Sequence, residues 1–412
     1  MTDQKKIPQI RFRGFNREWE EKTLGGFGSV AMNKRIFKDQ TSPKGDVPFY
    51  KIGTFGKEPD SFISRELFEQ YKEQYPYPQK GDLLISASGS IGRVVEYEGK
   101  DEYFQDSNIV WLDHDDQVLN PFLKQFYSFV KWAGLEGSTI KRLYNKNILD
   151  TKIDLPLPEE QSQIGTYFEE LDRLIDLHRQ KQKKLLTLKK GMLNKMFPVS
   201  GSSTPDIRFK GFSAPWGGGQ LKNYATFSKG QGYSKGDLVE LGSPIVLYGR
   251  LYTSYQTEIS DVDTYVREQK GSVKSTGKEV LVPSSGESAA DIARASAVIK
   301  AGLILGGDLN VILPSSSIDS SFLALAISNG TPQQDLVRRA QGKSVVHLRN
   351  TDLEAVEVRY PSLEEQQKIS AYFRQLDELL SQYGAQFEKL KQLKAACLET
   401  MFVQGVEYDI SH

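Results

Sequence analysis

Residues 156–197 read PLPEEQSQIGTYFEELDRLIDLHRQKQKKLLTLKKGMLNKMF, and residues 361–402 read PSLEEQQKISAYFRQLDELLSQYGAQFEKLKQLKAACLETMF. The second stretch repeats the first at a displacement of 205 residues, with Glu-Glu-Gln, Tyr-Phe, Leu-Asp and Met-Phe in register. An internal repeat of this length indicates that the chain contains two copies of one structural design.

Both stretches carry apolar residues at alternating spacings of three and four, which is typical of a long amphipathic helix with heptad character. A helix of about forty residues is about 60 Å long, too long for one small domain to cover. We therefore expect the two helices to cover each other as an antiparallel coiled coil. The predicted seam of the first helix consists of Ile164, Phe168, Leu171, Ile175, His178, Gln182 and Leu185, then Leu188, Met192 and Met196. That of the second consists of Ile369, Phe373, Leu376, Leu380, Tyr383, Phe387, Leu390, Cys397 and Met401.

A second repeat opens each half of the chain. The motif PQIRFRGF at residues 8–15, followed by Trp19, returns as PDIRFKGF at residues 205–212, followed by Trp216, a displacement of 197 residues. The sequence therefore predicts an α+β fold with a pseudo-two-fold internal repeat. The expected parts are a globular domain over 1–155, a long helix over 156–198, a second globular domain over 199–360, a second long helix over 361–402 and a tail over 403–412.

Short apolar runs between turn residues predict strands within the globular parts. In the first part these are 47–52, 81–86, 92–97, 108–112 and 152–155, with a helix over 121–131. In the second they are 244–248, 279–282, 295–299, 310–313 and 355–360, with a helix over 321–328. The order of elements repeats while the residues largely differ, which favours two related domains with different targets.

Composition narrows the function classes. The chain has 53 Lys and Arg against 53 Asp and Glu, so it lacks the basic excess typical of proteins that bind nucleic acid alone. With one cysteine, Cys397, and four histidines, it offers no internal disulfide and no metal-ligand cluster at zinc spacing. No apolar run is long enough to span a membrane, and the first residues lack a signal core, so we expect a cytoplasmic protein without a membrane partner.

Catalytic motifs are incomplete. Asn120-Pro121-Phe122 lacks the second proline of an adenine methyltransferase motif, and Gly342-Lys343-Ser344 lacks the upstream glycine of a phosphate-binding loop. We predict no catalytic residue and no metal site in this chain.

The entry motif with its tryptophan and the Glu-Glu-Gln to Met-Phe helix motif, each present twice, resemble the specificity subunit of type I restriction-modification systems. The resemblance covers the whole chain. It implies two target-recognition domains, each reading one half of a bipartite asymmetric site in double-stranded DNA, with the helix pair setting the unread spacer. It further implies two docked methyltransferase subunits that modify adenine N6, and restriction subunits that translocate and cut. S-adenosylmethionine, ATP and Mg are then expected in those partners, with no cofactor in this chain.

Base reading requires hydrogen-bonding side chains on loops, with Arg, Lys, Asn and Gln favoured. The candidates in the first domain are Lys34, Arg35, Lys38, Ser88, Ser90, Arg93, Lys141, Arg142, Tyr144, Asn145 and Lys146. Those in the second are Lys229, Gln231, Tyr233, Lys235, Tyr248, Arg250, Arg294, Lys343, His347, Arg349 and Asn350. A tandem protein-interaction scaffold spaced by the same coiled coil is the alternative, and a self-sufficient methyltransferase is a remote third.

Overall fold

The computed structural model describes residues 6–132, 142–342 and 345–403. The chain forms two compact units, one of Met1–His178 with Gln386–His412 and the other of Arg179–Ala385. Each unit therefore contains one globular domain and one half of each long helix.

The first unit is built on small sheets. Its elements before the long helix are β1 (Glu20–Thr23), β2 (Gly28–Ala31), β3 (Val47–Tyr50), β4 (Phe62–Ile63), α1 (Arg65–Gln74), β5 (Leu83–Ser86), β6 (Val94–Glu96), β7 (Tyr103–Phe104), β8 (Ile109–His114), α2 (Asn120–Phe129), α3 (Asn145–Leu149) and β9 (Lys152–Leu155). An antiparallel sheet has the order β2-β8-β5-β6, a second sheet has the order β4-β3-β7, and β1 pairs with β9.

The second unit contains two five-stranded sheets. Its elements before the last helix are β10 (Gly217–Gln220), β11 (Ala225–Lys229), β12 (Leu238–Val239), β13 (Ser243–Val246), α5 (Arg250–Thr253), β14 (Glu258–Ile259), β15 (Tyr265–Val266), β16 (Lys274–Thr276), β17 (Val280–Pro283), β18 (Ser285–Gly286), α6 (Ala289–Ile292), β19 (Ser296–Val298), β20 (Ala301–Leu305), β21 (Leu309–Pro314), α7 (Ser320–Ile327), α8 (Gly330–Arg339), β22 (Val346–His347), α9 (Asn350–Glu354) and β23 (Glu357–Tyr360). The sheets have the orders β11-β21-β17-β19-β14 and β12-β15-β13-β20-β16, with β10–β23 and β18–β22 as separate pairs.

The two domains share one scaffold. The strand order β2-β8-β5 of the first recurs as β11-β21-β17 in the second. The pairing of Glu20 with Leu155 recurs as that of Gly217 with Tyr360. The predicted α+β repeat is thus confirmed. Neither α1 nor α8 was predicted from the sequence, because both are short and carry few apolar residues.

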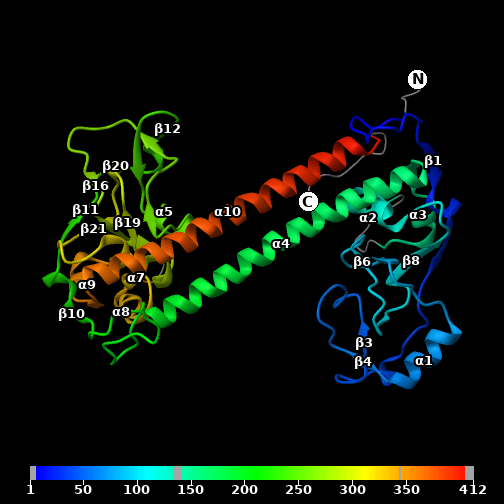
Figure 1. The fold of residues 1–412 in the computed structure, drawn as a ribbon, viewed down its shortest axis with the longest axis horizontal. Helices are drawn as coiled ribbons and strands as arrows, with labels where there is room; N and C mark the ends of the chain where they lie inside the picture. The colour runs from blue at the N-terminus through cyan, green and yellow to red at the C-terminus, as the bar shows by residue number, and fades with distance from the viewer. Residues whose placement is uncertain (1–5, 133–141, 343–344, 404–412) are drawn as a thin grey trace. The chain divides into compact units, whose positions relative to one another are not determined.

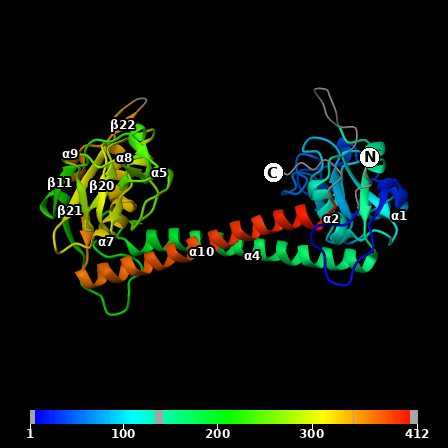
Figure 2. The ribbon, with the colours of Figure 1, turned by 90° about the horizontal axis from the view of Figure 1, so that it is seen from above.

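The long helices are α4 (Pro158–Met196) and α10 (Leu363–Met401), each of 39 residues. Within each unit, half of α4 runs antiparallel beside half of α10 (Figures 1 and 2). The seam residues nearest the domains are buried, namely Ile164, Phe168, Leu171, Ile369, Phe373 and Leu376. Those nearer the middle of the helices are half-buried, namely Ile175, Leu185, Leu380, Phe387 and Leu390.

The prediction for Leu188 is wrong, because its side chain is 45% exposed. Heptad spacing continues from Leu185 by four residues rather than three, which places Lys189 on the seam. Lys189 forms an ion pair with Asp377 of α10. In the other unit Lys394 of α10 forms the equivalent ion pair with Asp172 of α4, at 2.6 Å.

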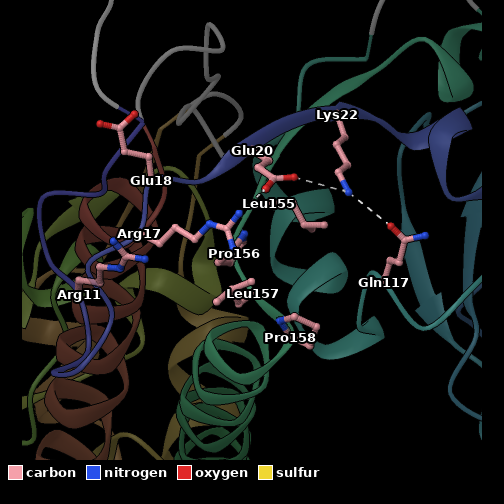
Figure 3. A pocket seen from close by; sticks show the side chains of 10 residues that line it. All are labelled: Arg11, Arg17, Glu18, Glu20, Lys22, Gln117, Leu155, Pro156, Leu157 and Pro158. Atoms are coloured by element: carbon pink, nitrogen blue, oxygen red, sulfur yellow. Dashed lines mark hydrogen bonds and ion pairs between the residues drawn. The ribbon is translucent and has the colours of Figure 1, made fainter.

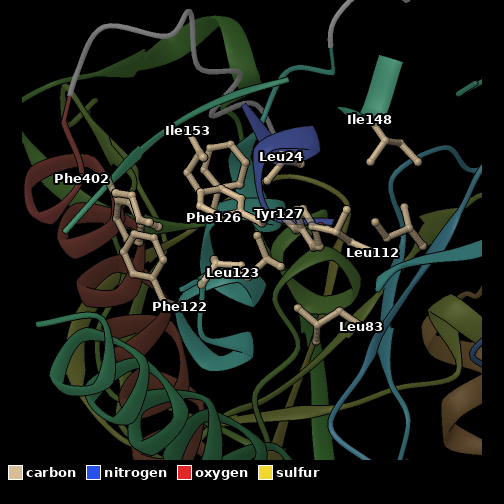
Figure 4. Packing of buried hydrophobic residues seen from close by; sticks show 14 of the residues in the cluster. Leu24, Leu83, Leu112, Phe122, Leu123, Phe126, Tyr127, Ile148, Ile153 and Phe402 are labelled. Atoms are coloured by element: carbon tan, nitrogen blue, oxygen red, sulfur yellow. The ribbon is translucent and has the colours of Figure 1, made fainter. Parts of the chain in front are cut away.

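The repeated Met-Phe ends of the helices complete the domain cores. Phe402, just after α10, stacks on Phe122 of α2 in the first domain, with ring centroids 5.2 Å apart (Figure 4). Phe197, just after α4, stacks on Phe322 of α7 in the second domain, at 5.6 Å. Thus α4 directly follows the first domain and its end packs in the core of the second, whereas α10 directly follows the second domain and its end packs in the core of the first. This packing requires the two helices to run antiparallel.

Candidate nucleic-acid interface

Three loops meet beside the end of β5 in the first domain. The backbone N–H of Ala87, in the loop after β5, donates to the carbonyl of Asn108 in the turn before β8, at 2.7 Å. The N–H of Leu143, before α3, donates to the carbonyl of Ala87 at 2.8 Å. The candidate Ser88 donates its hydroxyl to Oδ1 of Asn108 at 2.8 Å. These bonds fix the loops on one another, and we call this region the three-loop junction.

Two predicted arginines are attached to the same turn. Nε of Arg35 donates to Oδ2 of Asp106 at 2.9 Å, and Nη2 of Arg142 donates to the carbonyl of Ser107 at 2.8 Å. Arg35 and Arg142 are far apart in sequence, and the junction brings both guanidinium groups to adjacent residues. Cations held on loops in this way suit contacts with phosphates and base edges.

The second domain builds the same junction. The N–H of Ser284, after β17, donates to the carbonyl of Asp308 at 2.8 Å, and the N–H of Leu348 donates to the carbonyl of Ser284 at 3.0 Å. Ser284 and Leu348 stand at the positions of Ala87 and Leu143, displaced by 197 and 205 residues. The backbone of the junction is therefore repeated while its side chains differ.

Other side chains occupy the second junction. His347 of β22 pairs with Ser285 of β18, which follows Ser284 directly. The rings of Tyr248 and Tyr252 lie 6.2 Å apart, and Cε1 of Tyr252 is 4.0 Å from where a Cβ on the neighbouring Gly286 would lie. Burial raises the pKa of Tyr252 above its ordinary value of 10.0, and the neighbouring tyrosine and carboxylates add to the rise. The phenol therefore stays protonated and can donate a hydrogen bond at neutral pH.

Further candidates of the first domain lie in other settings. The ammonium of Lys34 lies 4.8 Å from the ring centroid of Tyr75, and Arg93 donates to the carbonyl of Phe55 at 2.8 Å. Tyr144 is 63% exposed directly before α3. The remaining candidates are Lys38, at the start of a short 3-10 helix, Ser90, whose carbonyl accepts the Ser86 hydroxyl, and Asn145 and Lys146, in α3. Lys141 lies outside the described residues.

The candidates of the second domain also lie in several settings. Gln231 and Arg349 are exposed loop residues, and the exposed Lys235 starts a short 3-10 helix. Lys229 ends β11, and Asn350 donates to the carbonyl of Ser228 at 3.1 Å. Tyr233 shares a hydrogen bond of 2.6 Å with Ser272, Arg250 pairs with Asp263, and Arg294 lies 5.7 Å from the ring centroid of Tyr255. Lys343 lies outside the described residues.

The turns before β8 and β21, which take part in the three-loop junctions, were not among the residues predicted to contact DNA. They are Asp106-Ser107-Asn108 in the first domain and Gly306-Gly307-Asp308 in the second. Their signal was present, because Asp, Asn and Gly directly before a strand favour a tight turn. Ser107 and Asp308 both have a left-handed backbone, with φ of 56° and 57°.

The entry motif and the start of each long helix form a second repeated surface. In the first unit a cavity of about 120 Å³ lies between Arg11, Arg17 and the segment 155–158 (Figure 3). In the second unit a cavity of about 380 Å³ lies between Arg208, Phe212 and the segment around Pro361. Leu157, which lines the first cavity, is exposed. Three residues that each lie next in sequence to a lining residue are also exposed, namely Ile10, Ile207 and Leu363.

Among the described residues, no group of three or more His, Cys, Asp or Glu side chains could hold a metal ion. No helix within the described ranges is long and apolar enough to cross a membrane.

Known proteins resemble this chain, and one family model matches it twice, once in each half. A family model described as the type I restriction modification DNA specificity domain matches residues 16–187 and again 219–392. A putative type I restriction enzyme specificity subunit of Haemophilus influenzae is 55% identical over 152 residues, which are 37% of this chain and 40% of that protein. The match thus spans about two fifths of that relative.

Two further proteins match over most of their length. The type I restriction enzyme MjaVIII specificity subunit of Methanocaldococcus jannaschii is 24% identical over 337 residues, 76% of each chain. The crystal structure of a type I restriction-modification S subunit from M. genitalium shares the fold, with a TM-score of 0.63 at 15% identity over 96% of this chain and 99% of that one. Because the family model covers most of this chain in two consecutive copies, the chain belongs to the specificity-subunit family of type I restriction-modification systems.

Proposed function

We propose that this chain is the DNA-reading subunit of a type I restriction-modification complex. Each domain would read one half of a bipartite, asymmetric site, and the helix pair would set the number of unread base pairs between the halves. The observation that carries this proposal is the three-loop junction, which repeats in backbone while its side chains differ. A shared frame with different hydrogen-bonding groups suits two readers of different sequences.

Partner subunits would dock on what the two halves share. The entry motifs, the starts of the long helices and their exposed apolar side chains occur in both units, which suits two identical partners. We propose that these partners are adenine-N6 methyltransferase subunits, joined by restriction and translocase subunits. This chain would then be non-catalytic, and S-adenosylmethionine, ATP and Mg would be bound by the partners. It also places the complex in the cytoplasm, with its DNA.

The balanced charge of the chain supports a division of labour in DNA binding. Non-specific affinity for duplex DNA rises with the number of phosphates that cations neutralise. With 53 basic and 53 acidic side chains, the isolated chain has no net positive charge to attract DNA, so we expect it to bind DNA weakly by itself. We propose that the partner subunits supply much of the phosphate contact while this chain supplies the base contacts.

Adenine-methylation mapping tests the proposal directly. Genomic DNA would be compared between cells with this gene intact and cells with it deleted, with the partner methyltransferase shown to be expressed in both. Loss of one bipartite asymmetric motif on deletion is the expected result. An unchanged methylome would overturn the proposal and favour the protein-interaction scaffold.

A further inference from the structure

We propose that Arg35 reads a guanine in the half-site of the first domain, and that Asp106 is the residue that positions it. This inference rests on the proposed function and names one element of the recognised sequence. It starts from the ion pair of Arg35 and Asp106 at the three-loop junction.

The geometry of the pair leaves the reading end of the arginine free. Asp106 accepts a hydrogen bond from Nε of Arg35, at 2.9 Å, and within the described ranges this guanidinium makes no other hydrogen bond. The two Nη amino groups can therefore donate side by side. Guanine offers the matching pair of acceptors, N7 and O6, in the major groove, and this bidentate contact is the commonest specific one that arginine makes.

Arg35 and Asp106 differ in burial, as expected if Arg35 contacts a base and Asp106 holds it in position. The side chain of Arg35 is 61% exposed, whereas that of Asp106 is 15% exposed. The hydroxyl of Ser107 also donates to Oδ2 of Asp106, at 3.0 Å, and fixes the carboxylate in the turn. An arginine held in place before binding loses less side-chain freedom when it contacts DNA.

The second domain lacks this device at the equivalent place. Asn108 and Asp308 are equivalent, because the carbonyl of each accepts the N–H that follows β5 or β17 in its junction. Asp106 therefore corresponds to Gly306, which has no carboxylate. Arg35 corresponds to Gly232, at the displacement of 197 residues that relates the entry motifs. There the contact is made by backbone alone, with the N–H of Gly307, which follows Gly306, donating to the carbonyl of Gly232 at 2.6 Å. The guanine reader is thus specific to the first domain.

The experiment measures duplex binding by the full chain assembled with its methyltransferase partners. After methylation mapping gives the motif, each guanine of each half-site is replaced in turn by 7-deazaguanine, which lacks the N7 acceptor. The wild-type complex should bind one substituted duplex on the order of tenfold to a hundredfold more weakly than the unsubstituted one. The complex with Arg35→Ala should bind these two duplexes equally.

Two further variants separate guanine reading from charge. Arg35→Lys keeps the positive charge without the planar fork, and should lose the preference for the guanine as Arg35→Ala does. Arg65→Ala removes another exposed arginine of the same domain that pairs with an aspartate, Asp101, and should keep the wild-type preference. If Arg35→Ala binds no site at all, Asp106→Asn, which retains the guanidinium, is measured in the same way and should show a reduced preference.

The outcomes are distinct. Specific binding in which no guanine is coupled to Arg35, or a uniform loss of affinity for every duplex on Arg35→Ala, overturns the assignment and leaves the reader function standing. A wild-type complex without a preferred site, together with a methylome that does not change on gene deletion, overturns both.

Discussion

The guanidinium of Arg208 donates two hydrogen bonds to the carboxylate of Glu365, each of 2.7 Å. Arg11 makes the equivalent pair with Glu160 in the other unit, at 2.6 and 2.7 Å. Both carboxylates are 1% exposed. These pairs tie each entry motif to the first turn of a long helix, which explains why both sequence motifs repeat together.

Arg208→Ala should therefore destabilise the protein strongly. It leaves the carboxylate of Glu365 buried without its cation, which costs about 3–5 kcal/mol of unfolding free energy. Urea denaturation followed by circular dichroism measures the loss. Arg173→Ala is the matched control, because its pair with Glu170 is exposed on both sides and should contribute less than about 1 kcal/mol. Similar losses in both variants would contradict the assignment.

Two glycines of α4 should respond oppositely to alanine. A Cβ on Gly165 would lie 2.5 Å from Cβ of Pro121 and 3.2 Å from the backbone nitrogen of Phe122, so Gly165→Ala should cost about 1–3 kcal/mol through overpacking. A Cβ on Gly191 meets no atom within 4 Å, and Gly191→Ala should stabilise the helix by up to about 1 kcal/mol. Thermal melting of both variants checks the pair, and a loss of stability in Gly191→Ala would contradict the account.

Sequence periodicity predicted the scaffold because it depends on apolar spacing and on repeats. The strands around residues 84, 110, 281 and 311, the α2 and α7 helices and both long helices are observed close to their predicted ranges. The seam position of Lys189 was not predicted, because a lysine is buried there only through its ion pair with Asp377, which lies on the other helix. Pairing across elements leaves no local pattern in the sequence.

The candidate interface was harder to predict for the same reason. Arg35 and Arg142 are recognisable as loop cations, but their shared attachment to one turn arises from tertiary contacts between distant segments. Arg250 begins the short helix α5, and its guanidinium is paired with Asp263 rather than with the turn of the three-loop junction. Sequence gives the type of side chain, whereas the fold decides which of them are brought together.

Glu21 should make stability sensitive to acid. Hydrogen bonds from Lys6 and Lys152 lower the pKa of this carboxyl from 4.5 to about 2. Because the pKa is lower in the folded state, the contribution is complete above pH 4.5 and is lost as the pH falls toward 2. The side chain is 44% exposed, so solvent screening keeps the effect below about 1 kcal/mol. Glu21→Gln should flatten the stability profile in this range relative to wild type, and an unchanged slope would count against the interaction.

The inter-helix ion pairs should couple measurably. Lys394 and Asp172 lie at 20% and 36% side-chain exposure, between exposed surface pairs and a buried pair. A double-mutant cycle with Lys394→Ala and Asp172→Ala should give a coupling energy of about 0.5–1 kcal/mol. The equivalent cycle at Lys189 and Asp377 should give a similar value, since the two pairs are related by the repeat. A coupling energy near zero in both cycles would show that the two ion pairs do not help to fix the register of the helices.

Arg142 and His347 stand at equivalent positions, each directly before the leucine whose N–H closes the three-loop junction. If each junction reads its own half-site, Arg142→Ala should relax or abolish sequence preference in one half of the methylated motif only. His347→Ala should affect the other half only. Each lost base contact should reduce discrimination by about 1–3 kcal/mol, roughly tenfold to a hundredfold in methylation of mismatched sites. Methylation mapping in cells that carry each variant measures this. Changes by both variants in the same half would contradict the assignment of one domain to one half-site.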